Sequence, residues 1–141
     1  MNGLVELDEL IATLDPVLDG EEYVFITQAD ARCGERQELQ PIATFAEREG
    51  LTLVVPKRNA DGAGLQYDGS FQRIILRVHS SLHAVGLTAA VTSALARCGM
   101  SANVIAAFYH DHIFVPTSRG QEALQVLEGL ANEKSENKSN S

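Results

Sequence analysis

The four histidines are the side chains whose spacing comes closest to that of metal ligands. His79 and His83 stand four residues apart, and His110 and His112 form an H-x-H pair. On a strand such a pair points both rings to one face, which suits a transition metal. A turn at this place would separate the rings, and no Glu or Cys completes a recognisable ligand set. We therefore expect no metal and no cofactor, and a His-rich metal-binding protein stays as the second alternative.

Nucleophilic chemistry has weaker support in the sequence. Ser80 and Ser81 lie near histidines, but no G-x-S-x-G turn surrounds them, and neither Cys33 nor Cys98 has a local base. Serines at the start of a helix more often cap it. We therefore expect no catalytic residues, and we do not expect an enzyme.

Among the motifs of the sequence, the segment SSLHAVGL, from Ser80 to Leu87, gives the strongest indication of ligand binding. Here a strand over 71–79 is expected to lead into a helix over 84–98. The first turn of a helix leaves backbone N–H groups without partners, and these attract a carboxylate or another anion. Gly86 has no side chain, so a ligand or a neighbouring chain can approach the backbone closely. Tight packing of helix on sheet explains the same glycine equally well, and both interpretations stay open.

Alternating helix and strand patterns position these residues. Apolar spacing predicts helices over 3–14, 84–98 and 121–131, and Pro41 before and Gly50 after the segment predict a helix over 42–49. Runs of β-branched or aromatic residues predict strands over 22–28, 51–55, 71–79, 101–110 and 113–115. The glycine-rich stretch 57–70 predicts a loop, and His110-Asp111-His112 predicts a tight hairpin.

Two small halves and a tail follow from these elements. Residues 1–65 are expected to form a first half with the order α-β-α-β, and residues 66–131 a second half with the order β-α-β-β-α. The low-complexity segment 132–141 predicts a disordered tail. The second half matches a ferredoxin-like unit without its last strand. We expect a strand of the first half or of a second copy to fill that edge.

Charge and composition exclude several partners. The net charge is −8, and residues 1–70 hold 14 acidic against 5 basic side chains, with no basic cluster elsewhere. Such a field repels nucleic acid and anionic membranes, so we expect neither as a partner. Two distant cysteines, no secretory leader and no apolar run near ~18 residues predict a reduced, cytoplasmic chain.

The run from His79 to Pro116 resembles the ACT domain family. From Leu4 to Ala131 the chain is similar to small bacterial tandem ACT-like proteins that share the segments LDPVLDGEEYVF, VHSSL, GLTAAV and YHDHIFVP. The resemblance implies an α+β fold of two ferredoxin-like (ACT-like) βαββαβ modules in tandem, with antiparallel sheets and helices on one face. It also implies sensing of a small molecule, most often an amino acid, between modules. The ligand-binding positions it implies are Ser80, Ser81, His83, Ala84, Val85, Gly86, Leu87, Asn103, His110 and Asp111.

These observations predict a regulatory or binding protein. We expect an amino acid or similar small polar ligand, with its carboxylate on the amides around Val85 and Gly86 and its ammonium group at Asp111 or at a carbonyl. A homo-oligomer, most simply a dimer, is the expected assembly. ACT domains normally regulate a fused catalytic or DNA-binding domain, and none is recognised here, so we expect either that the chain regulates a separate protein or that its ligand site has been lost. The alternative is a ligand-free interaction module that uses exposed strand edges to form a homodimer.

Overall fold

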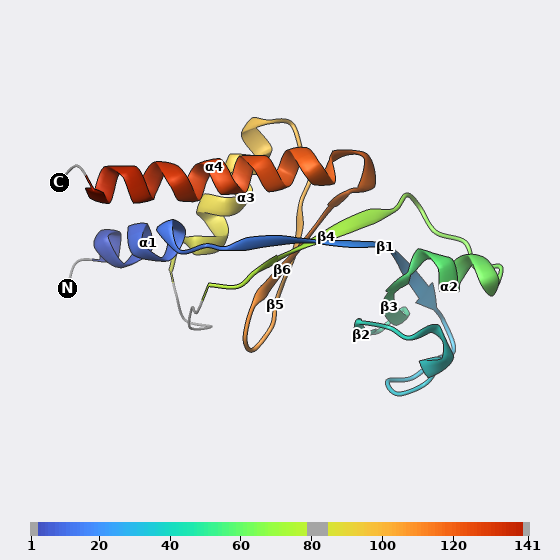
Figure 1. Ribbon diagram of the computed structural model, residues 1–141. Coiled ribbons are helices and arrows are strands. Elements are labelled where there is room, and N and C mark those ends of the chain that lie inside the picture. The colour runs from blue at the N-terminus through green and yellow to red at the C-terminus, as the bar shows by residue number, and fades with distance from the viewer. Residues whose placement is uncertain (1–2, 79–84, 140–141) are drawn as a thin grey trace. The chain divides into compact units, whose positions relative to one another are not determined.

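The computed structural model describes residues 3–78 and 85–139 of the chain (Figure 1). Residues 1–19 and 73–141 form one compact unit, and residues 20–72 form another. We call the first the terminal unit, because it holds both ends of the chain, and the second the inner unit. The elements in chain order are α1 (Gly3–Ala12), β1 (Pro16–Gln28), the 3-10 turn η1 (Gln37–Leu39), β2 (Ala43–Glu47), β3 (Gly50–Pro56), α2 (Lys57–Gly62), β4 (Phe71–Leu76), α3 (Leu87–Arg97), β5 (Asn103–Ala106), β6 (Asp111–Pro116), the 3-10 turn η2 (Thr117–Arg119) and α4 (Gly120–Ser139).

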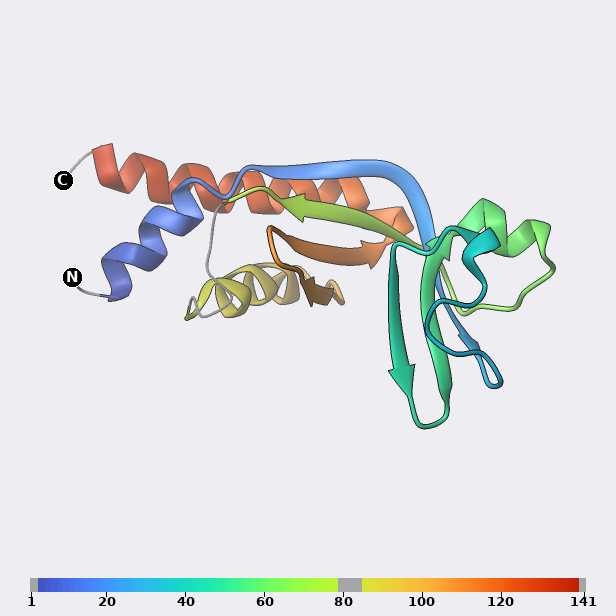
Figure 2. The same ribbon diagram turned by 90° about the horizontal axis from the view of Figure 1, so that it is seen from below.

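The terminal unit packs α1, α3 and α4 on one face of a sheet with the strand order β1-β4-β6-β5. Figure 2 shows β4 and β6 running in opposite directions, with α4 passing behind β4. Side chains of a strand alternate between its faces, so Ile74 and Leu76 of β4 share the helix-facing side. They are buried with Ile113 and Val115 of β6. The helices contribute Ile11, Leu87, Val91, Leu95, Ala123 and Leu127 to this core.

The open edge beside β4 is filled by the chain's own β1. The amide of Arg77 donates to the Asp15 carbonyl at 3.3 Å, and the Arg77 side chain pairs with the Asp15 carboxylate at 3.0 Å. Arg73 pairs with Asp19 at 2.7 Å, with about four-fifths of each side chain buried. The sequence leaves open whether a strand of the first half or of a second copy fills this edge. In the structure it is a strand of the first half of the same chain.

The inner unit is a three-stranded antiparallel sheet with the order β2-β3-β1, and it carries the short helix α2. The β1–β3 ladder runs from the pair Tyr23 and Pro56 to the pair Gln28 and Leu51. Its core joins one face of these strands to α2 through Ala60. The other buried members are Val24, Ile26, Leu39, Leu51, Leu53 and Val55.

The helix expected over 42–49 is wrong, because this segment is strand β2. Ala43 to Glu47 pair with β3, and Glu47 lies opposite Gly50 across a turn formed by Arg48 and Glu49. Gly50 has a φ of 152°, which a side chain disfavours and which lets the chain reverse tightly here. Pairing with a neighbouring strand has therefore overridden the helical propensity of the segment.

The loop expected over 57–70 instead begins with a helix. Pro56 ends the β3 ladder with a φ of −57° and a ψ of 135°, and α2 follows at once. The hairpin β5–β6 ends in the same way, since Pro116 has a φ of −53° and a ψ of 137° before η2 and α4. Proline has no N–H for the ladder and a φ suited to entering a helix, so each hairpin passes directly into a helix.

Four boundaries also differ from the expectations. Residues 132–139 continue α4 instead of forming an irregular tail, because Ala131 still lies in the core and Lys134 pairs with Asp8 at 3.2 Å. β1 begins at Pro16 and not at residue 22. The β5–β6 turn lies at residues 107–110 and not at 110–112, and it is closed by the Ala107 amide donating to the His110 carbonyl at 3.1 Å. Asp111 and His112 therefore belong to β6. The units change near residues 19 and 72 instead of at residue 65.

Candidate functional site

Gly86, at the start of α3, is one of the described residues of the predicted ligand loop. Its φ is 93°, and no side chain caps the helix, whose first bond runs from the Ala90 amide to the Gly86 carbonyl at 2.9 Å. A Cβ added here would lie 3.1 Å from Cδ2 of Leu7 in α1. The space beside the glycine is therefore occupied by the protein's own side chain. This contact favours the packing interpretation of Gly86, while the amides of the first helical turn still lack intrahelical partners.

The two neighbours of Gly86 differ in what they can contribute. The Val85 side chain is 88% exposed, so it is available to a ligand or a partner. Leu87 is 2% exposed and belongs to the core of the terminal unit, so it positions the helix and cannot touch a ligand with its side chain. The predicted positions Ser80, Ser81, His83 and Ala84, with His79, lie outside the described residues.

Asp111 begins β6 at the edge where β4 ends. β4 and β6 run in opposite directions, so the end of β4, from which the chain continues toward Val85, lies at the same edge as Asp111 (Figure 2). Burial raises the pKa of Asp111, and no hydrogen bond or ion pair to its carboxylate occurs within residues 3–78 and 85–139. A partly buried carboxylate with no partner is suited to receive an ammonium group. We use the name junction site for three described residues of the predicted ligand set, Val85, Gly86 and Asp111.

Of the two remaining predicted positions, Asn103 lies away from Asp111, whereas His110 directly precedes Asp111 in the hairpin turn. Asn103 pairs with Phe114, whereas Asp111 pairs with Ala106 at the other end of the same ladder. Three steps along a strand span about 10 Å, so Asn103 lies away from the junction site. His110 closes the hairpin turn, and its ring is tilted against Tyr109 with 6.5 Å between centroids.

His112 lies one residue beyond Asp111 in β6. Burial lowers its pKa below the usual 6.5, and the nearby charges of Arg73 and His110 lower it further. A histidine whose folded pKa is lowered stabilises the fold above its unfolded pKa, and this contribution is lost as the pH falls below 6.5. We expect the melting temperature to drop on acidification from about pH 7.5 to 5.5, the range in which an ordinary histidine titrates.

The variant His112→Gln should show a shallower drop over the same range, because it removes the titrating group. Asp111 acts in the opposite sense, since its raised pKa favours the fold at low pH. Thermal melts of both proteins at a series of pH values measure the difference. Equal slopes in the two proteins would contradict the assignment to His112.

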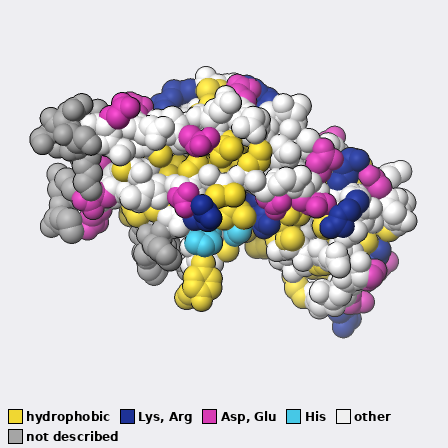
Figure 3. Space-filling view, viewed as in Figure 1, with side chains coloured by type: hydrophobic (Ala, Val, Ile, Leu, Met, Phe, Trp, Pro, Cys, Tyr) yellow, Lys and Arg dark blue, Asp and Glu magenta, His cyan; other side chains and the backbone are white. Residues whose placement is uncertain are grey.

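The β5–β6 hairpin of the terminal unit carries exposed aromatic residues. Phe108 is 77% exposed and Tyr109 is 70% exposed, and their rings form an edge-to-face pair with 5.0 Å between centroids. In Figure 3 hydrophobic side chains project at this hairpin, with histidine side chains beside them. Exposed aromatic pairs are typical of surfaces that contact a partner.

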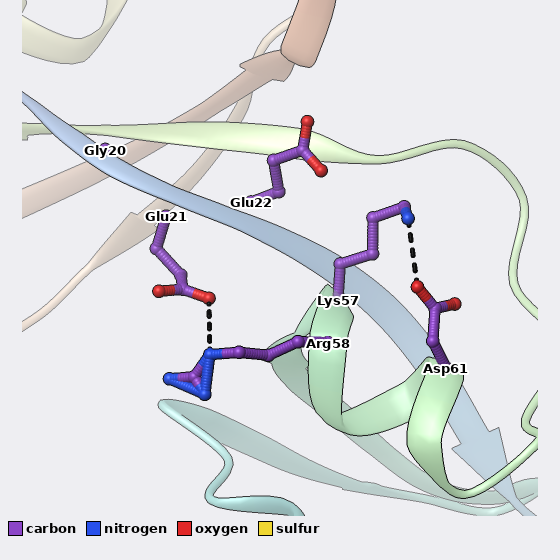
Figure 4. A pocket seen from close by; sticks show the side chains of 6 residues that line it. All are labelled: Gly20, Glu21, Glu22, Lys57, Arg58 and Asp61. Carbon is purple, nitrogen blue, oxygen red and sulfur yellow. Dashed lines mark hydrogen bonds and ion pairs between the residues drawn. The ribbon is translucent and has the colours of Figure 1, made fainter.

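The inner unit contains a pocket of about 300 Å³ lined by charged side chains. The β1–β3 ladder ends at Tyr23 and Pro56, and beyond this pair β1 continues as a strand while the other segment turns into α2. The two segments therefore separate and leave an opening between them. We call this opening the inner-unit pocket. The residues that line it are Gly20, Glu21, Glu22, Lys57, Arg58 and Asp61 (Figure 4).

Two ion pairs occupy part of this pocket. Lys57 donates to Asp61 at 2.9 Å, and Arg58 donates to Glu21 at 3.1 Å. Hydrogen bonds from the Tyr67 hydroxyl, at 2.6 Å, and from Lys57 lower the pKa of Asp61, and the bond to Asp61 raises the pKa of Lys57. Both groups are therefore charged at neutral pH. Glu22 differs from them, because within the described residues its carboxylate has no hydrogen bond or ion pair.

Sequence reasoning missed the inner-unit pocket. The acids at 19–22 look like a solvated turn in the sequence, and nothing there indicates that Lys57 and Arg58 face them from more than thirty residues away. The one available signal is Pro56, which marks where the strand pairing must stop.

No group of three His, Cys, Asp or Glu side chains able to hold a metal ion occurs in the described part of the chain. His79 and His83, on which the metal alternative depends, lie outside it. Among the helices of residues 3–78 and 85–139, none has both the length and the apolar character needed to span a membrane.

Comparison with known proteins defines the class. One ACT domain model matches residues 2–72 and a second matches residues 72–129. The chain therefore belongs to the ACT domain family, with two such domains in tandem, and the ferredoxin-like α+β architecture is confirmed. ACT domains are regulatory modules that commonly bind small ligands and oligomerise, which supports a regulatory ligand-binding role here.

The solved structures similar to the chain include one at high identity. A protein of unknown function from Vibrio cholerae, titled a "Possible Transport Protein", is 47% identical with a TM-score of 0.84, covering 92% of this chain and 99% of its own. The regulatory subunit of aspartate kinase from Thermus thermophilus, in its ligand-free form, is 10% identical with a TM-score of 0.59, covering 82% and 95%. A protein from Agrobacterium tumefaciens is 14% identical with a TM-score of 0.61, covering 78% and 81%. No curated protein matches the sequence.

Proposed function

We propose that this chain is a cytoplasmic sensor of an amino acid or similar small polar ligand, and that it regulates a separate protein without being an enzyme. The family supports a regulatory ligand-binding role, and one neighbour of the same fold is the regulatory subunit of aspartate kinase. The observation that carries the proposal is the partly buried carboxylate of Asp111, which within the described residues has charge interactions with His112 and His110 but no hydrogen bond or ion pair.

The proposed contacts use both ends of an amino acid at the junction site. Its carboxylate accepts hydrogen bonds from the amides at the start of α3, where no side chain caps the helix. Its ammonium group meets Asp111 and compensates the cost of burying that carboxylate. Binding stabilises one conformation of the protein, most simply of a homodimer, over another, and this difference is the signal.

A thermal-shift screen against the twenty amino acids tests the proposal. A ligand present at 100 times its dissociation constant should stabilise the fold by about 2.7 kcal/mol, which raises the melting temperature clearly. No stabilisation by any amino acid at millimolar concentration would contradict amino-acid sensing. That result would favour the ligand-free interaction module, for which the exposed Phe108 and Tyr109 provide a contact surface.

The variant Asp111→Asn should weaken binding of the amino acid found in that screen by about tenfold or more, because it removes the charge that faces the ammonium group. The matched control is Asp68→Asn, which neutralises an exposed carboxylate of the inner unit. Isothermal titration of the three proteins gives the affinities. Equal affinities for the wild type and Asp111→Asn would exclude Asp111 from the site.

A further inference from the structure

We propose that the inner-unit pocket is a second binding site, which takes a small organic cation and holds its primary ammonium group on the carboxylate of Glu22. This site goes beyond the proposed sensing function, because it lies in a different unit and shares no residue with the junction site. Its support is the shape of the pocket, its charge balance and the state of Glu22.

The pocket is a consequence of the strand pairing. The β1–β3 ladder ends at the pair Tyr23 and Pro56. On the far side of this pair, residues 20–22 still belong to strand β1, whereas the chain after Pro56 becomes α2. Gly20 adds no side chain to the opening. The volume of about 300 Å³ is at the lower end for ligand pockets, so the occupant is a small molecule.

The charge balance selects a cation. The lining has three carboxylates, on Glu21, Glu22 and Asp61, against the two cations of Lys57 and Arg58. Both cations already have partners, at 2.9 Å and 3.1 Å, which leaves Glu22 as the uncompensated charge. An anionic ligand would have to displace one of these pairs and would also be repelled by Glu22, whereas a cation needs no rearrangement.

The chemistry of the Glu22 carboxylate indicates which kind of cation the pocket would bind. A carboxylate accepts hydrogen bonds and donates none, so its complement is a donor-rich cation. An ammonium group is a compact charge with three donors, and it fits a pocket of this size better than a bulky planar cation does. Figure 4 shows Glu22 and Lys57 extending from β1 and α2, with the Lys57 ammonium paired with Asp61 and no pair drawn to Glu22.

Titration of the full chain with 1,4-diaminobutane, followed by amide NMR spectra at low salt, tests this site. We expect saturable shifts at the amides of residues 20–22 and 57–61 in the millimolar range or below. Succinate, which has the same chain length with the charges reversed, should give no saturable shifts. Raising the salt concentration should weaken diamine binding, since the contact is between charges in a partly exposed site.

The variant Glu22→Gln should weaken diamine binding about tenfold, and it should fold normally because Glu22 makes no ion pair to lose. The control Glu49→Gln removes an exposed carboxylate from the β2–β3 turn and should bind as the wild type does. Asp111→Asn should also bind the diamine normally, which separates this site from amino-acid sensing. Unsaturable shifts, equal binding by Glu22→Gln, or equal binding of succinate would each overturn the proposal.

Discussion

Replacing Gly50 with alanine is expected to destabilise the inner unit by about 2 to 4 kcal/mol. The φ of 152° at Gly50 is a conformation that residues with a side chain rarely adopt. A Cβ there would also lie 2.9 Å from Cα of Ala29 and 3.0 Å from the carbonyl oxygen of Gln28. Both neighbours are backbone atoms of the adjacent strand region, which cannot move aside without breaking the β1–β3 ladder.

The variant Gly64→Ala separates the two causes of this effect. Gly64 also has a positive φ, of 69°, but a Cβ at that position meets nothing within 4 Å. Its substitution should therefore cost about 1 kcal/mol, from backbone strain without a clash. Urea unfolding followed by circular dichroism measures both variants. A cost for Gly50→Ala no larger than that for Gly64→Ala would show that the close contact contributes nothing.

Leu127→Ala should destabilise the terminal unit by about 2 to 5 kcal/mol. The Leu127 side chain is completely buried on α4, in the core formed by the helices and by β4 and β6. Its truncation removes methyl groups from this core and leaves a cavity, because the surrounding helices and sheet relax only in part. The same core includes Leu87, so the variant also loosens the helix start that belongs to the junction site.

The control for this prediction lies two residues earlier on the same helix. Gln125 is exposed on α4, so Gln125→Ala should change the free energy of unfolding by no more than about 0.5 kcal/mol. The same urea titrations compare the two variants. A loss below about 1 kcal/mol for Leu127→Ala would mean that the core collapses around the site and that α4 is less firmly packed than its burial indicates.

Local patterns predicted the elements whose apolar residues have a clear period. Helices expected over 3–14, 84–98 and 121–131 correspond to α1, α3 and α4, because one face of each meets the same core. The segment 42–49 failed this test. The helix there was predicted only from Pro41 and Gly50 at its two ends. Phe45 is 70% exposed, so the segment has no apolar face in a core, and pairing with β3 decides its conformation.

For the candidate sites, too, some residues could be named from the sequence, whereas the surroundings of others depend on distant parts of the chain. Asp111 was named from its position in a recognisable motif, and its role in binding stays a prediction; the structure adds that burial raises the pKa of its carboxyl group. Gly86 was also singled out, but the contact with Leu7 that explains it comes from α1, almost eighty residues earlier in the chain. Glu22 was read as part of a solvated turn, because its unpaired state in a pocket depends on where α2 begins.

By itself the sequence determined the ferredoxin-like α+β class and the family, since hydrophobic period, proline and glycine positions and short motifs are local properties. Only the tertiary structure decided that β1 completes the sheet beside β4, that residues 43–56 form a hairpin, and that Glu22 and Lys57 line one pocket. The physical reason is that these features join residues far apart in the chain, and their free energy comes from pairing and burial that no single segment contains.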